Sequence, residues 1–150
     1  MIDASGFFQY PGEMDLAPAQ AEFLAGKTDA EWATVLAHTE TRRFRPGENV
    51  LTEGEADRAL YVLVDGRLEY EGGIVEPVST IGEAAFLDGG RRAVTLRAVT
   101  DGEVLRMSWD SFEALAAREP LLARELLVDI GCILAGRLRA AGAGTPGWTG

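Results

Sequence analysis

The middle of the chain, residues 44–107, consists of short runs of alternating or β-branched residues separated by glycine-containing turns. The most regular runs are residues 60–64, 93–99 and 104–107. Alternation with a period of two places one set of side chains on a buried sheet face. The Asp65-Gly66 pair lies between two such runs and favours a tight primed hairpin turn. Many short strands with glycine turns predict an antiparallel β-roll or sandwich.

Helical patterns flank these runs on both sides. Residues 28–31 (TDAE) have the form of a capping box and predict a helix over residues 28–39. Residues 110–113 (DSFE) repeat the pattern, and Pro120 suits the first turn of a further helix. The apolar stripe of that last helix continues to about Arg139. These patterns predict an α+β, mainly β, protein: an antiparallel β-roll with one N-terminal and two C-terminal helices around a single core.

The predicted domain covers residues 24–140. Residues 1–23 are predicted to form an irregular arm that contains Phe7, Phe8 and Tyr10, and residues 141–150 are predicted to form a flexible tail that contains Trp148.

Composition narrows the classes of function. The 150 residues carry 14 Lys and Arg against 24 Asp and Glu, a formal net charge of −10, so direct binding to nucleic acid is not expected. Cys132 is the sole cysteine, which favours a cytoplasmic protein without disulfides or bound metal. No apolar run reaches the roughly 18 residues that span a membrane, and the acidic start does not fit a secretory signal. One histidine, one cysteine and no triad or Walker motif argue against an enzyme.

A basic island stands out in this acidic chain. Residues 89–100 contain Arg91, Arg92 and Arg97 and no acid, which is typical of an anion site. Backbone N–H groups at a turn, with an arginine close by, bind phosphate. Because a carboxylate repels phosphate, Glu83 just before the island needs another donor, such as a sugar hydroxyl. The alternative is a surface ion pair between Glu83 and Arg92, worth about 0.2–1 kcal/mol.

Several segments resemble a known family, in unbroken order over about residues 24–140. They are PGE at 46–48, EGE at 53–55, LYVL at 60–63, GRL at 66–68, GE at 82–83 and LDGGRRA at 87–93. They look like the cyclic nucleotide-binding domain of the catabolite activator and protein kinase A regulatory subunit superfamily. The resemblance implies a jelly-roll-like β-roll, a double-stranded β-helix, with a phosphate-binding cassette at residues 82–95.

In that cassette the resemblance implies that Glu83 accepts from the ribose 2′-hydroxyl and that Arg92 pairs with the cyclic phosphate. It also implies that the backbone N–H groups of Ala85 and Ala93 complete the anion cradle, and that Gly82 permits close approach to the ribose. The predicted ligand-binding set is Gly82, Glu83, Ala84, Ala85, Arg91, Arg92, Ala93 and Val94. No catalytic and no metal-binding residues are predicted.

The cassette departs from the family's usual pattern at Ile81, Ala84, Arg91 and Val94, where Phe, Leu or Met, Pro and a second small residue are frequent. Arg91 and Val94 add charge and bulk at a tight turn, which predicts a low affinity although both anchors are kept. Ala93 lacks the threonine hydroxyl associated with cGMP preference, which favours cAMP over cGMP as the ligand.

Two functions remain open. The first is a stand-alone cyclic nucleotide-binding regulatory module in bacterial signalling, which acts on a partner protein by rearrangement of the C-terminal helices. The alternative is a ligand-free domain of the same fold that serves as a scaffold or assembly protein and docks through the aromatic arm. The protein effector is unknown. The Leu- and Ile-rich C-terminal helices either form a homodimer or are used fully against the roll.

Overall fold

The computed structural model describes residues 26–143, which form eight strands and four helices. The strands are β1 (Glu40–Phe44), β2 (Asn49–Leu51), β3 (Ala59–Asp65), β4 (Leu68–Tyr70), β5 (Gly73–Val75), β6 (Ser79–Ile81), β7 (Leu96–Ala98) and β8 (Gly102–Ser108). The helices are α1 (Asp29–Ala37), α2 (Glu83–Asp88), α3 (Trp109–Arg118) and α4 (Pro120–Ala143). The predicted aromatic arm and Trp148 lie outside the described residues.

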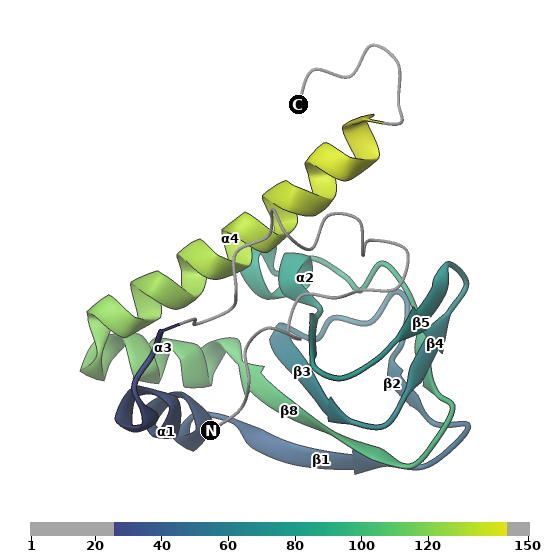
Figure 1. The fold of residues 1–150 in the computed structure, drawn as a ribbon, viewed down its shortest axis with the longest axis horizontal. Coiled ribbons are helices and arrows are strands. Elements are labelled where there is room, and N and C mark those ends of the chain that lie inside the picture. The colour runs from purple at the N-terminus through teal and green to yellow at the C-terminus, as the bar shows by residue number, and fades with distance from the viewer. Residues whose placement is uncertain (1–25, 144–150) are drawn as a thin grey trace.

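Two four-stranded antiparallel sheets make up the roll. Their strand orders are β1-β8-β3-β6 and β2-β7-β4-β5. Figure 1 shows α1, α3 and α4 gathered along one side of the roll, with α2 between α4 and the strands. The predicted class, mainly antiparallel β with one helix before the roll and two after it, is confirmed. The short helix α2 within the roll is additional.

The predicted hairpin at Asp65-Gly66 is wrong. β3 pairs with β6 and β8, whereas β4 pairs with β5 and β7, so the chain passes from one sheet to the other at this point. Gly66 has a φ of +92°, and a Cβ there would lie 2.6 Å from the carbonyl oxygen of Asp101. Gly102 in turn faces the carbonyl oxygen of Asp65. Two Asp-Gly corners therefore pack against each other where the chain changes sheet.

The core consists of two clusters rather than the single one predicted. The inward faces of both sheets form the first cluster: Phe44, Leu51, Ala59, Tyr61, Leu63, Leu68, Val75, Ile81, Leu96, Ala98 and Val104. The helices and the outer face of β3 and β8 form the second: Trp32, Val35, Leu60, Phe86, Met107, Phe112, Leu115, Leu122, Ala123, Leu126, Ile130 and Ile133. Because β3 contributes to both clusters, the sheet β1-β8-β3-β6 packs against the other sheet on one face and against the helices on the opposite face.

The helix starts follow local hydrogen bonding. The capping box of Thr28 and Glu31 is present at the start of α1, as predicted. At α3 the N-cap is Ser108 rather than Asp110, because the Ser108 side chain accepts from the backbone N–H of Ser111. Asp110 instead lies in the first turn, where a negative charge is favourable.

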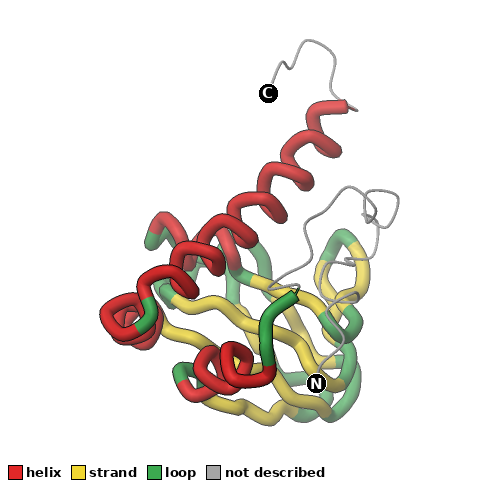
Figure 2. Tube along the Cα trace, turned by 60° about the vertical axis from the view of Figure 1, so that its left-hand side comes forward, coloured by secondary structure: helices red, strands yellow, loops and turns green. Residues whose placement is uncertain are grey.

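The helix α4 is longer than predicted, since it continues past Arg139 and through Gly142. A single glycine lowers helix stability by about 1 kcal/mol but does not end a helix. Figure 2 shows the C-terminal part of α4 extending beyond the roll. Leu126, Ile130 and Ile133 of this helix are fully buried. Along residues 26–143, no helix is both long and apolar enough to cross a membrane.

Candidate functional site

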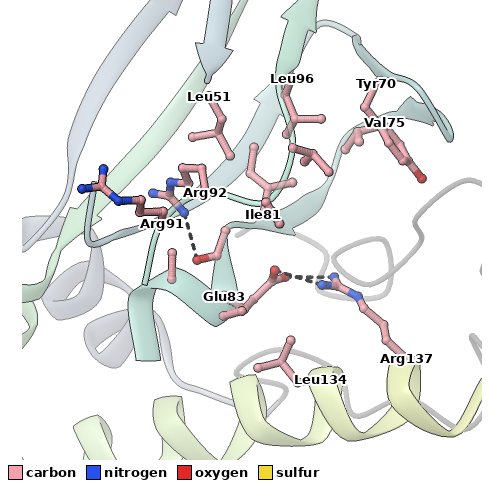
Figure 3. A pocket seen from close by; sticks show the side chains of 15 residues that line it. Leu51, Tyr70, Val75, Ile81, Glu83, Arg91, Arg92, Leu96, Leu134 and Arg137 are labelled. Carbon is pink, nitrogen blue, oxygen red and sulfur yellow. Dashed lines mark hydrogen bonds and ion pairs between the residues drawn. The ribbon is translucent and has the colours of Figure 1, made fainter. Parts of the chain in front are cut away.

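A cavity of about 270 Å³ lies between the segment after β6, the β4–β5 hairpin and α4 (Figure 3). All eight residues of the predicted ligand-binding set line it: Gly82, Glu83, Ala84, Ala85, Arg91, Arg92, Ala93 and Val94. The other lining residues lie outside that set: Leu51, Tyr70, Val75, Ile81, Leu96, Leu134 and Arg137. The cavity therefore has a polar side around Glu83 and Arg92, and an apolar side formed mostly by the second sheet.

Gly82 joins β6 to α2 in a left-handed backbone conformation, with a φ of +81°. A Cβ at this position would collide with the Arg92 guanidinium and lie 3.3 Å from the carbonyl oxygen of Ala59. Glycine is therefore required both by the backbone dihedral and by the space that Arg92 occupies. The predicted close approach of Gly82 to a ribose stays a prediction.

Glu83 opens α2 and is 2% exposed. The guanidinium of Arg137, on α4, donates from Nη1 to Oε1 and from Nη2 to Oε2 of Glu83, both at 2.9 Å. Thr80 Oγ1 donates to Oε2 at 2.7 Å. Figure 3 shows Arg137 reaching from α4 across the cavity to the carboxylate. This bidentate pair connects the cassette directly to the last helix.

Arg92 is 4% exposed and turns toward the wall of the roll. Its Nη1 donates to the carbonyl oxygen of Gly82 at 3.1 Å, and its Nη2 donates to the carbonyl oxygen of Ala59 at 2.8 Å and to Asp57 Oδ2 at 3.2 Å. Its Nε is buried without a hydrogen-bond partner. A buried donor without an acceptor is rare, so this atom is a polar group that the protein leaves unsatisfied.

The predicted alternative, a surface ion pair between Glu83 and Arg92, is wrong. Both side chains are buried, and each pairs with a different residue, Arg137 or Asp57. The physical reason is the direction of each side chain: Glu83 faces α4, whereas Arg92 faces the roll.

Asp57, in the loop before β3, joins Arg92 to a larger network. Its Oδ2 accepts from the Tyr61 hydroxyl at 2.6 Å, and its Oδ1 accepts from Arg106 Nη2 at 2.7 Å. Burial alone would raise the pKa of Asp57, but hydrogen bonds from Tyr61, Arg106 and Arg92 outweigh it and hold the pKa at about 2. Burial, and donation to Asp57, raise the pKa of Tyr61. Asp57 is therefore a fixed anion beside Arg92.

Among the remaining predicted residues, Ala85 is buried, whereas Ala84 and Ala93 are exposed. Arg91 and Val94 are exposed, and Arg91 Nη1 donates to the carbonyl oxygen of Gly54 at 2.8 Å. Figure 3 shows Arg91 pointing away from the Glu83–Arg137 pair. The extra charge of Arg91 is thus directed out of the cavity.

Sequence reasoning missed Arg137 and Asp57. Arg137 follows the buried Ile133 by four residues and Ile130 by seven, so it lies on the same helix face as both. A lone arginine continuing an apolar stripe was the available signal. Asp57 sits in a polar loop after a turn, and its distant partners Arg92 and Arg106 cannot be inferred from spacing.

The fold and the cavity together define a β-roll with an internal pocket that is bordered by a C-terminal helix. A family model described as "Cyclic nucleotide-binding domain" matches residues 41–119. The chain belongs to the cyclic nucleotide-binding domain family.

Relatives with named functions support this assignment. The chain is 29% identical over 126 residues to the cyclic AMP receptor protein of Thermus thermophilus, covering 77% of this chain and 56% of that protein. It is 34% identical over 92 residues to the cAMP-dependent protein kinase regulatory subunit of Emericella nidulans, covering 57% of this chain and 22% of that protein. The chain therefore spans only part of each of these relatives.

Among solved structures, a cyclic nucleotide-binding domain from Methylobacillus flagellatus is similar in fold, with a TM-score of 0.73 and 20% identity. The match covers 97% of this chain and 88% of that one.

The residues present fit the chemistry of a cyclic nucleotide. Arg92 offers a buried donor without a partner, Glu83 offers a carboxylate for a hydroxyl, and the second sheet offers apolar walls for a ring. The cavity volume is close to the lower end of the range for small-molecule pockets, about 300–1,000 Å³.

Proposed function

We propose that this chain is a regulatory module that binds a cyclic nucleotide, preferentially cAMP, and signals to a partner protein by repacking α4. The observation that carries the proposal is the bidentate contact of Arg137 with Glu83. It joins the residue proposed to bind the ribose to the helix proposed to move.

Arg92 would hold the cyclic phosphate, because its guanidinium is a buried cation of the pocket wall and its Nε has no protein partner. Glu83 would accept a hydrogen bond from the ribose 2′-hydroxyl. The apolar walls, including Val75 and Leu96, would cover the base. Ala93 brings no hydroxyl to the pocket, which supports cAMP over cGMP.

The coupling to α4 follows from the shared carboxylate. A ribose hydroxyl that donates to Glu83 shares that carboxylate with Arg137, so ligand binding and the position of α4 are linked. A ligand shifts the helix only by the difference between its affinities for the two arrangements. The outer face of α4 includes the exposed residues Leu121, Val128 and Leu138. A repacked helix would present this face differently to an effector or to a second copy of the chain.

The test is titration calorimetry of the protein with cAMP and with cGMP, repeated on Arg92→Gln. Loss of a charge-assisted hydrogen bond costs about 1.5–3 kcal/mol, which is more than tenfold in affinity. The matched control is Arg43→Ala, since the Arg43 side chain is 87% exposed. Thermal melts show whether each variant is folded under the titration conditions.

Binding of cAMP that weakens more than tenfold in Arg92→Gln and stays unchanged in Arg43→Ala supports the proposal. Absence of heat and of thermal stabilisation at millimolar cAMP and cGMP overturns it, and leaves the ligand-free scaffold as the alternative.

A further inference from the structure

Arg106 lies outside the pocket lining but is connected to the phosphate-binding arginine through Asp57. It projects from β8, the strand between β1 and β3 in the first sheet. Its Nη2 donates to Asp57 Oδ1 at 2.7 Å, and its Nε donates to the Tyr61 hydroxyl at 3.2 Å. The other Asp57 oxygen accepts from Arg92. The carboxylate therefore bridges two arginines.

The charges of this cluster explain why two arginines are needed. Asp57 and Arg92 alone form a neutral pair, and such a pair attracts an anionic ligand weakly. Arg106 adds a second positive charge, so the three groups together carry a net charge of +1. Two further acids bear on this charge. Glu40 accepts from Arg106 Nη1 at 3.2 Å, but its side chain is 53% exposed and solvent screens it. Glu83 lines the same cavity as Arg92 and is paired with Arg137.

Asp57 also fixes the direction of the Arg92 side chain. Together with the carbonyl oxygens of Gly82 and Ala59, it engages both Nη atoms of Arg92, whereas Nε has no partner in the protein. An arginine that is held in place loses less conformational entropy when it binds a ligand.

We propose that Arg106 and Asp57 are positioning residues for the nucleotide phosphate: Asp57 orients Arg92, and Arg106 restores the positive charge that Asp57 cancels. The inference rests on the proposed function, because it concerns the affinity of the same pocket. It assigns a role in affinity to a residue on the far side of Asp57, outside the residues that line the cavity.

The test is a double-mutant cycle read by titration calorimetry with cAMP. Arg106→Gln leaves Asp57 and Arg92 as a neutral pair, and we expect its affinity to fall about tenfold. Asp57→Asn in the same chain removes the charge that Arg106 compensated. We therefore expect the double variant Asp57→Asn/Arg106→Gln to bind cAMP more tightly than Arg106→Gln alone.

A structural role would predict the opposite order, because removing both partners disrupts the wall at least as much as removing one. Arg106→Lys keeps the charge and should retain most of the affinity. Glu40→Gln is the matched control, since it alters an exposed partner of Arg106 and should change affinity less than twofold. If Arg106→Gln does not fold in thermal melts, Arg106→Met replaces it and keeps the apolar length of the side chain.

The outcomes distinguish a failure of the proposed nucleotide binding from a failure of the role proposed for Arg106 and Asp57. Wild-type protein that binds no cAMP overturns the proposed function and this inference together. Wild-type protein that binds cAMP, with Arg106→Gln unchanged or the double variant weaker than Arg106→Gln, overturns this inference alone.

Discussion

Two carboxylate–arginine systems hold the two polar anchors of the pocket, and they differ in what they connect. Glu83 pairs with Arg137, which comes from α4 outside the roll. Arg92 pairs with Asp57, which also accepts from Arg106, and all three belong to the roll. The first system crosses the boundary between two structural units, whereas the second stays within one.

The Glu83–Arg137 pair is a contact that is able to switch, because it joins two units. The network of Asp57, Arg92 and Arg106 forms a fixed frame within the roll. An ion pair across a boundary exchanges for a ligand contact when one unit moves, and the sheet stays intact. An ion pair inside the roll changes only if strands move, which close packing resists. The buried residues Leu126, Ile130 and Ile133 anchor the middle of α4. The part of α4 that follows them is the part that the Glu83–Arg137 contact holds.

The largest expected effect comes from Gly82→Ala, which disturbs both systems at once. The added side chain would be strained at a φ of +81° and would collide with the Arg92 guanidinium, and Glu83 is the next residue in the chain. Residues held in such a conformation cost about 1–3 kcal/mol, and we expect a loss of unfolding free energy at the upper end of that range. Binding of cAMP should fall below detection. Urea unfolding and titration calorimetry measure the two effects.

The matched control for this prediction is Gly47→Ala. Gly47 has a φ of +91°, but its nearest neighbour to a Cβ is Arg97 Nη2 at an ordinary 3.8 Å. It should lose stability through strain alone and keep its cAMP affinity. Equal loss of affinity in both variants would contradict the assignment of Gly82 to the site.

Arg137→Ala should break the contact that crosses the boundary and leave the frame intact. The buried Glu83 carboxylate then keeps Thr80 as a donor and loses the bidentate bond from the Arg137 guanidinium. Breaking a fully buried pair costs about 3–5 kcal/mol. Because the Arg137 side chain is 19% exposed, we expect a smaller loss of unfolding free energy, about 2 kcal/mol.

Hydrogen exchange tests the switching role of the same variant. In the wild type, cAMP should change amide exchange both in the cassette and in the C-terminal part of α4. In Arg137→Ala the change in α4 should disappear while that in the cassette remains. Arg139→Ala, an exposed position two residues further along the helix, is the control and should behave as wild type. A persistent α4 response in Arg137→Ala would show that coupling runs by another route.

The two systems also differ in how far the sequence predicts them. The sequence predicts the anchors Glu83 and Arg92 because they lie close together in one short cassette. The same holds for the other six residues of the predicted ligand-binding set. The sequence does not predict the partners Asp57, Arg106 and Arg137, since each comes from an element distant in the chain. The predicted Asp65-Gly66 hairpin was wrong for the same reason. The local sequence is compatible with either a hairpin or a corner between two sheets, and the distant contact with Gly102 determines which of them forms.

The smallest expected effect concerns the frame and depends on pH. The pKa of Asp57 is about 2 in the folded protein against 3.8 as its ordinary value, so its ionised form is favoured by folding. A depressed pKa contributes stability above the ordinary value, and this contribution is lost as the pH falls toward 2. The Asp57 side chain is 21% exposed and screening weakens the pairs, so Asp57→Asn should lose about 1 kcal/mol at pH 6.

Chemical unfolding of wild type and Asp57→Asn between pH 6 and pH 2.5 follows this contribution. The difference between the two proteins should be constant from pH 6 to about pH 4.5 and should narrow as the pH falls further, because only the wild type loses the Asp57 charge. The Glu83 system is present in both proteins, so it cancels in the difference. A difference that stays constant down to pH 2.5 would mean that shape rather than charge makes Asp57 part of the frame, and the contrast between the two systems would then rest on Arg137 alone.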